Sequence, residues 1–265
     1  MVRQIVDNLY MIQEPYELPN DVYEAARPDW YELGSEITVF NNAYLIQGEQ
    51  TLLFDTLSPY STDDVLAELQ AVLGDDELDY LAISHPENPH AGNTFAILDE
   101  YPDATLVGPK YSTRHEVYYL EDSKKVEHGD RIDLGGYEVE FLEPAFPDHP
   151  VHVWMRERKT ETLFTIDWLG SIHLDSHKEK FADEVDGGVD VQQLVDFTSQ
   201  ALFWHRYADP ERLHAVIDNL IEAFDPEIVA PAHGFVYREK PIEAMESMKA
   251  VADEIATSDG ERGAL

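Results

Sequence analysis

The chain has 265 residues, of which 54 are acidic and 18 basic, giving a formal net charge of −36, and 43% of its residues are hydrophobic. This length and apolar content suffice for a buried core, while the absence of cysteine excludes disulfides, thiolate-bound metals and a cysteine nucleophile. So negative a surface would repel nucleic acid and anionic membranes, so we expect neither as a partner.

The acidic residues are spread along the whole sequence and do not form a tail. This distribution is typical of a halophilic protein, because high salt screens the repulsion between like charges. No apolar run reaches the ~18 residues of a membrane-spanning helix. The first residues show no apolar core of a signal peptide. We therefore expect a cytoplasmic location.

The first half of the chain alternates between strand-like and helix-like segments. Short β-branched and aromatic runs predict strands, and apolar residues at helical spacing predict helices. The predicted strands are Gln4–Met11, Val39–Ile46, Thr51–Asp55, Leu78–Ser84 and Thr105–Gly108, and the predicted helices are Thr62–Leu73, Thr94–Glu100 and Ser112–Tyr119. The polar, aromatic-rich segment Pro15–Ser35 is predicted to be a loop or insertion.

The second half repeats the alternation. A hairpin is predicted over Arg131–Leu142, with its turn at Gly135–Gly136. Strands follow at His152–Met155, Thr162–Ile166 and Glu227–Ala230, and helices at Val191–Tyr207, Pro210–Phe224 and Ile242–Ser258. This order predicts an α/β fold of two mixed sheets back to back with helices outside. No linker-like stretch separates the halves, so we expect a single domain, residues 1–265.

Three residues able to bind a metal lie within six positions, on the loop that follows a buried strand. They are His85, Glu87 and His90, in the stretch Ser84–Asn93. Imidazole and carboxylate groups are suitable ligands for zinc, iron or manganese. Taken alone, the three could equally be polar residues on the surface of an acidic protein.

Three further strand ends each carry one ligand-type residue. His149 follows the predicted hairpin, Asp167 follows Leu163–Ile166, and His233 follows Ile228–Ala230. A single histidine at a strand end is usually structural. Four strand ends of this kind in one chain indicate a metal centre. His152 competes with His149 for one position, and His149 is preferred for its spacing to Asp167.

The pattern His-x-Glu-x-x-His, followed by His149, Asp167 and His233, resembles the metallo-β-lactamase superfamily. The stretches Asn42–Ile46, Leu53–Thr56 and Ala230–Gly234 also resemble strands of that family. The resemblance implies the αββα sandwich of that superfamily. Within it, the chain looks like the metal domain of flavodiiron proteins, which have Glu where the zinc hydrolases have His. Glu87 stands at that position, and a carboxylate favours iron, with zinc as the alternative.

The resemblance implies two metal positions. The first would be held by His85, Glu87, His149 and Asp167, and the second by His90, His233 and the bridging Asp167. Pro89 stands where the family pattern has a further aspartate ligand. We therefore expect one or two metals per chain, with the second bound weakly. Asn88, Asp148 or His152 could supply a missing ligand.

The sequence lacks the phosphate-binding loop of a flavodoxin, so we expect no FMN domain and no other organic cofactor. Electrons would then come from a separate donor protein, and a homodimer is expected. Three functions remain open. They are O₂- or NO-responsive redox chemistry at non-haem iron, metal-dependent hydrolysis by a metal-activated water, and a non-catalytic O₂-binding sensor or degenerate scaffold.

The charge predicts a steep salt dependence of stability. Self-repulsion of the −36 charge should destabilise the folded chain at low ionic strength. We expect the thermal unfolding midpoint to rise steeply between about 0.1 and about 2 M KCl, since the Debye length falls from about 10 Å to about 3 Å near 1 M. A midpoint that does not change over this range would contradict the halophilic interpretation.

Overall fold

The computed structural model describes residues 2–17, 37–110 and 123–262. The chain forms two compact units, each assembled from three stretches of sequence. The first unit contains residues 1–14, 41–144 and 149–160, and the second contains residues 15–40, 145–148 and 161–265. The predicted helix Ser112–Tyr119 and most of the segment Pro15–Ser35 lie outside the described residues.

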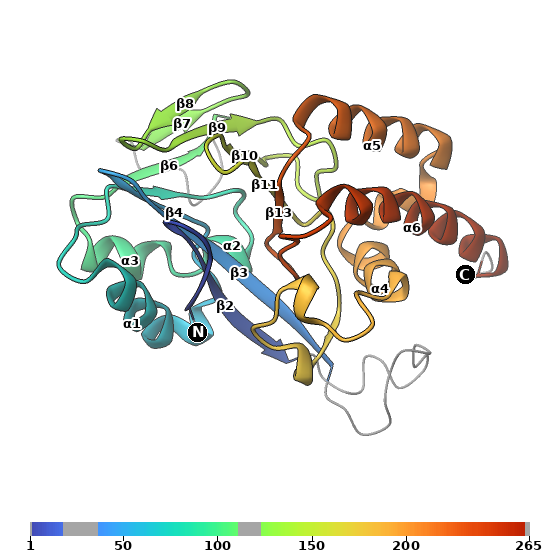
Figure 1. The fold of residues 1–265 in the computed structure, drawn as a ribbon, viewed down its shortest axis with the longest axis horizontal. Coiled ribbons are helices and arrows are strands. Elements are labelled where there is room, and N and C mark those ends of the chain that lie inside the picture. The colour runs from blue at the N-terminus through green and yellow to red at the C-terminus, as the bar shows by residue number, and fades with distance from the viewer. Residues whose placement is uncertain (1, 18–36, 111–122, 263–265) are drawn as a thin grey trace. The chain divides into compact units, whose positions relative to one another are not determined.

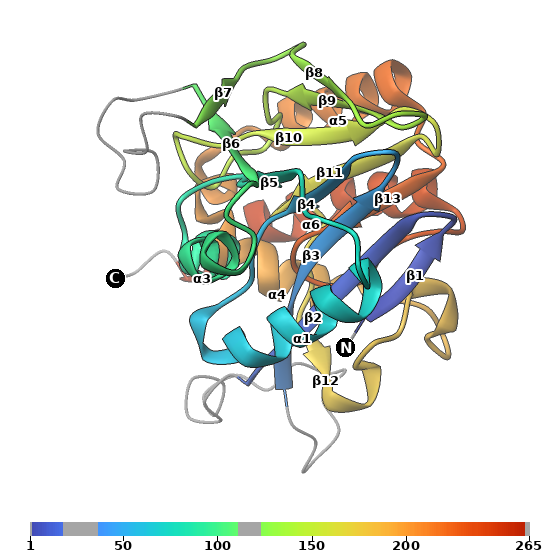
Figure 2. The ribbon, with the colours of Figure 1, turned by 90° about the vertical axis from the view of Figure 1, so that its left-hand side faces the viewer.

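A mixed sheet runs mostly through the first unit (Figure 2). Its strand order is β1 (Val2–Val6), β2 (Leu9–Glu17), β3 (Ile37–Gln47), β4 (Thr51–Phe54), β5 (Tyr80–Ala82), β6 (Thr105–Pro109) and β7 (Lys124–Val126). Strands β3 and β4 are antiparallel, whereas β4, β5, β6 and β7 are parallel neighbours. The parallel strands therefore bring their carboxyl ends to one edge of the sheet.

The predicted strand Gln4–Met11 is wrong as a single element. Residues 2–17 form the antiparallel pair β1–β2, and Asn8 at the turn has a φ of 63°. Asparagine tolerates this left-handed conformation better than most residues, so Asp7–Asn8 acts as a hairpin turn. The sequence interpretation overlooked this turn signal.

Two helices cover one face of this sheet in the first unit (Figure 1). They are α1 (Thr62–Leu73) and α3 (Thr94–Glu100), both with the predicted bounds. Val65, Leu69 and Leu73 recur at helical spacing on α1 and pack in one core with residues of β3, β4 and β5. Gly74 ends α1 with a φ of 62°, a conformation in which glycine carries no steric cost.

The first unit also contains three antiparallel strands. They are β8 (Arg131–Asp133), β9 (Glu138–Leu142) and β10 (Trp154–Glu157). The turn between β8 and β9 uses Gly135 and Gly136, with φ values of 73° and 89°, as a glycine-rich hairpin requires. The predicted hairpin is thus confirmed.

The second unit has two parallel strands, β11 (Thr162–Ile166) and β13 (Ile228–Pro231), and a short strand β12 (His173–Leu174) that pairs with the start of β3. Its helices are α4 (Val191–Ala201), α5 (Pro210–Phe224) and α6 (Pro241–Arg262), and both α4 and α5 pack against α6 (Figure 1). The predicted helix Val191–Tyr207 ends early, at Ala201, and a 3₁₀ turn over Phe203–Tyr207 follows.

The chain is thus an α/β protein with two mixed sheets and helices, as predicted. Shorter 3₁₀ turns lie at Pro59–Ser61, Asp175–His177 and Ala182–Glu184. Among the described residues, no helix is long and apolar enough to cross a membrane.

Candidate metal centre

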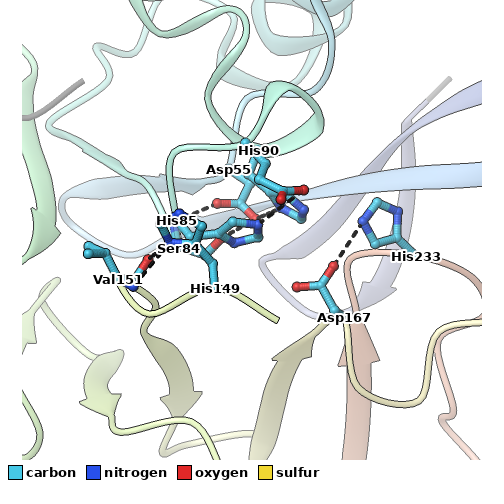
Figure 3. Close-up of polar contacts among 9 residues, drawn as sticks. Asp55, Ser84, His85, His90, His149, Val151, Asp167 and His233 are labelled. Atoms are coloured by element: carbon cyan, nitrogen blue, oxygen red, sulfur yellow. Dashed lines mark hydrogen bonds and ion pairs between the residues drawn. The ribbon is translucent and has the colours of Figure 1, made fainter. Parts of the chain in front are cut away.

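A buried carboxylate lies where two parallel strands of the first unit end. Asp55 follows β4 and Ser84 follows β5, and the two strands are parallel neighbours. The Ser84 amide N donates a hydrogen bond to Asp55 Oδ1 at 2.8 Å, and Ser84 Oγ donates to Asp55 Oδ2 at 2.9 Å (Figure 3). Asp55 is 1% exposed and Ser84 0%. Water therefore does not compete for these bonds.

Asp55 also forms a hydrogen bond with His90, a candidate ligand of the second metal. His90 lies on α2 (Asn88–Ala91), and its Nδ1 is 2.7 Å from Asp55 Oδ2 (Figure 3). An ionised carboxylate can only accept, so the imidazole Nδ1 is the donor. Its Nε2 is then the nitrogen that can bind a metal.

His85 lies beside His90, with the two ring centroids 4.0 Å apart. The His85 ring is fully buried, and its Nδ1 is 3.1 Å from Ser84 Oγ. The two histidines from the sequence motif are therefore brought together.

The Glu87 side chain is more exposed to solvent than the rings of His85 and His90. Its side chain is 54% exposed, and its Oε2 lies 3.8 Å from His85 Nε2. Glu87 precedes α2 with an extended backbone (φ −85°, ψ 157°). The carboxylate thus lies on the Nε2 side of His85, which is the side that a shared metal would occupy.

Both His149 and His152 approach His85 within the first unit. The His149 ring stacks on His85 at 5.9 Å, and the His152 ring lies closer, at 4.7 Å. A ring nitrogen of His152 lies within 4.8 Å of one of His85. His149 Nδ1 is 3.0 Å from the amide N of Val151, which donates to it (Figure 3). The same Nδ1 lies 3.1 Å from the Val151 carbonyl oxygen, to which it could only donate, so these two contacts do not select a tautomer for His149.

In the second unit, Asp167 and His233 lie together at the ends of parallel strands. Asp167 follows β11 and His233 follows β13, and Asp167 Oδ1 is 3.2 Å from His233 Nε2 (Figure 3). Both side chains are buried. A carboxylate oxygen of Asp148 also lies within 4.8 Å of one of Asp167. Asp148 therefore stays a candidate for an additional ligand.

The loop around His233 depends on a glycine. Ser171 N donates to the His233 carbonyl at 3.1 Å, which fixes the backbone at this position. Gly234 has a φ of 118°, and a Cβ there would lie 2.6 Å from Ser171 Oγ. No other residue type would fit without displacing Ser171.

Two other histidines of the second unit are packing groups. His173 lies between the rings of Phe40 and Phe235, at 4.5 and 4.2 Å, and burial lowers its pKa well below the ordinary value. Burial likewise lowers the pKa of His205 to about 4, and His205 packs against Phe146 and Trp204. Both therefore stay neutral at physiological pH.

The residues in both units fit a metal. They offer imidazoles and carboxylates, a nitrogen and oxygen set that suits iron, zinc or manganese. A cation would also stabilise the buried carboxylate of Asp167 beside His233, because burying a charge away from water is costly. The hydrogen bonds at Nδ1 of His85 and His90 are the kind that ligand histidines usually make.

Sequence comparison identifies the family of the chain. The sequence model of the metallo-β-lactamase superfamily matches residues 37–233, which run through both units and all the strand-end loops. The chain therefore belongs to the metallo-β-lactamase superfamily.

Curated relatives indicate which proteins of the superfamily the chain resembles. The chain is 34% identical over 149 residues to a putative diflavin flavoprotein A 2 of Nostoc sp., covering 55% of this chain and 26% of that protein. It is 28% identical over 204 residues to rubredoxin-oxygen oxidoreductase of Megalodesulfovibrio gigas, covering 74% of this chain and 49% of that protein. The chain thus spans about half the length of these curated relatives or less.

Solved structures show the same fold. The rubredoxin:oxygen oxidoreductase of Desulfovibrio gigas superposes with a TM-score of 0.72 at 20% identity, covering 97% of this chain and 61% of that one. A fragment, residues 1–254, of a putative diflavin flavoprotein A 5 from Nostoc sp. gives 0.74 at 18% identity, covering 97% and 98%. The homologues and structural neighbours are flavodiiron proteins, and this chain has the fold of their diiron domain.

The ring geometry predicts that His152 contributes more to metal binding than His149. We expect His152→Ala to weaken Zn²⁺ binding by more than the 10–100-fold typical of losing a supporting group. We expect His149→Ala to have the smaller effect, because the His149 ring is farther from His85. Competition with a chromophoric chelator in high salt measures both affinities. The reverse order would support the assignment of His149 made from sequence spacing.

Proposed function

We propose that this chain is a non-haem iron protein that binds or reduces a diatomic gas, O₂ or NO, using electrons from a separate donor protein. The observation that carries the proposal is the placement of the Glu87 carboxylate beside His85 Nε2, where zinc hydrolases of the superfamily have an imidazole. The similarity to a rubredoxin-oxygen oxidoreductase supports the same conclusion.

The proposal assigns the ligands as the family resemblance does. The first metal would be held by His85, Glu87, Asp167 and one of His149 and His152. The second would be held by His90, His233 and the same Asp167. Within each unit, the strand ends already group these side chains: His85 with His90, and Asp167 with His233.

Ferrous iron bound by these residues would supply electrons and an open coordination position for a diatomic ligand. The chain's own residues perform the remaining tasks. Asp55 holds His90 through Nδ1, and Ser84 contacts His85 Nδ1. Burial of both rings keeps bulk water from competing for their nitrogens. Glu87, being half exposed, is the ligand that a solvent-borne molecule meets first.

Metal content separates the redox proposal from hydrolysis. We expect protein purified in high salt to contain iron in excess of zinc, with a visible ferric absorption band. Glu87→His should shift the content toward zinc, because it replaces a hard oxygen ligand by imidazole. Glu87→Gln serves as a control for lost charge without a new nitrogen ligand. Zinc without iron in the wild type would favour the hydrolase.

Turnover then separates an enzyme from a sensor. Iron-loaded protein that consumes O₂ or NO with a reduced flavin or iron–sulfur donor is an oxidoreductase. Iron-loaded protein that binds the gas reversibly without turnover would instead be the sensor.

Pro89 predicts a weak second position. This proline lies in the first turn of α2, where its ring fits the helix start. We expect about one tightly held metal per chain. Pro89→Asp should raise this towards two, because it adds an anionic oxygen ligand.

Phe95→Asp is the charge control for Pro89→Asp, since it adds the same charge at an exposed position of α3 that is not a candidate ligand. Metal analysis of the three proteins measures the difference. Two tightly held metals in the wild type would show that another residue supplies the ligand, and Asp148 would be tested first. An equal gain from both variants would attribute the effect to charge alone.

The other sequence-based expectations stay proposals. They are a single domain over residues 1–265, a homodimer, a separate electron donor and a cytoplasmic location. The superfamily match across residues 37–233 supports the first, because it includes stretches of both compact units.

A further inference from the structure

The Asp55 carboxylate interacts with both histidines of the motif, with His90 directly and with His85 through the Ser84 hydroxyl. Asp55 Oδ1 accepts from the Ser84 amide, and Asp55 Oδ2 accepts from both Ser84 Oγ (2.9 Å) and His90 Nδ1 (2.7 Å). Neither Asp55 nor Ser84 belongs to the proposed ligand set. Both are buried, and both lie in the first unit with the histidines that they touch.

The hydroxyl of Ser84 determines the tautomer of His85. A serine hydroxyl has one proton and two acceptor lone pairs. Because Asp55 Oδ2 can only accept, that proton goes to Asp55 at 2.9 Å. The Ser84 oxygen must then accept from His85 Nδ1, 3.1 Å away. His85 therefore carries its proton on Nδ1 and presents the Nε2 lone pair.

We propose that Asp55 and Ser84 are positioning residues that fix both motif histidines in the Nδ1–H tautomer, Asp55 acting on His90 directly and on His85 through the Ser84 hydroxyl. The proposal rests on the metal-binding part of the proposed function. It requires neither iron nor redox chemistry. It links the two metal positions, because His85 and His90 belong to different ones.

The asymmetry of the network predicts different effects for the two residues. Ser84→Ala removes only the acceptor of His85 Nδ1–H and leaves the bond between Asp55 and His90. Asp55→Asn acts on both. With its amide nitrogen at the Oδ2 position, the new side chain donates to His90 Nδ1 and to Ser84 Oγ, and the Ser84 hydroxyl then donates to His85 Nδ1. Both histidines would be driven to the Nε2–H tautomer.

The test reads the tautomers in metal-free protein by ¹⁵N NMR of labelled histidines, assigned with His85→Gln and His90→Gln. We expect Nδ1–H for both histidines in the wild type. Ser84→Ala should shift only His85, and Ser84→Thr, which keeps the hydroxyl, should restore it. Asp55→Asn should shift both. Nε2–H at either histidine in the wild type, or an unchanged His85 in Ser84→Ala, would overturn the proposal.

Zn²⁺ affinity provides a second readout. Losing a group that orients a ligand typically costs 10–100-fold in metal affinity, and we expect a loss in that range for Ser84→Ala with recovery in Ser84→Thr. Ser61→Ala is the matched control, because the Ser61 hydroxyl donates to the Ser58 carbonyl and contacts neither motif histidine. Equal losses in Ser84→Ala and Ser84→Thr would indicate a packing effect and contradict the proposal.

These outcomes are distinguishable from failure of the proposed function. A protein that binds only zinc and reduces no gas would refute the redox proposal. The NMR test of the two tautomers would be unaffected by that result, because it is made on metal-free protein. Circular dichroism and thermal unfolding in high salt identify variants that fail to fold, and Ser84→Thr keeps the test decisive if Ser84→Ala is one of them.

Discussion

The candidate metal centre depends on the hydrogen bond between Asp55 and His90. It joins the end of β4 to the short helix α2 at 2.7 Å, in surroundings from which water is excluded. A charged acceptor in a buried site makes a strong bond and fixes the ring at the same time. The parallel pairing of β4 with β5 places Ser84 at the same edge, where it also donates to Asp55. The backbone topology thus determines which side chains can meet.

The second unit repeats this arrangement with other residues. There the parallel strands β11 and β13 end at Asp167 and His233, which lie 3.2 Å apart. Each unit therefore uses the carboxyl ends of parallel strands to place a carboxylate beside an imidazole. In the first unit the carboxylate orients a ligand, and in the second it is itself a proposed ligand. The tight turn at Gly234 shows how closely the second loop is packed.

The sequence predicted the strand ends that carry the ligands, because a buried apolar run followed by a single polar residue is visible without a structure. Asp55 has the same pattern after Leu52–Phe54, but its role was missed, since its partner His90 lies 35 residues away. The choice between His149 and His152 could not be made from spacing, because it depends on ring distances to His85. The β1–β2 hairpin was missed at Asp7–Asn8, and the two-residue strand β12 is too short to leave a periodic signal.

We infer that His85 and His90 bind metal through Nε2 while Nδ1 of each ring is hydrogen-bonded, to Ser84 Oγ and to Asp55 Oδ2 respectively. Anomalous diffraction at the iron and zinc edges, from crystals grown in high salt, tests it most directly. We expect an iron peak about 2.0–2.3 Å from Nε2 of His85, with Nδ1 still within hydrogen-bonding distance of Ser84 Oγ. A metal bound through Nδ1 of His85, or peaks only at sites remote from His85 and His90, would contradict it.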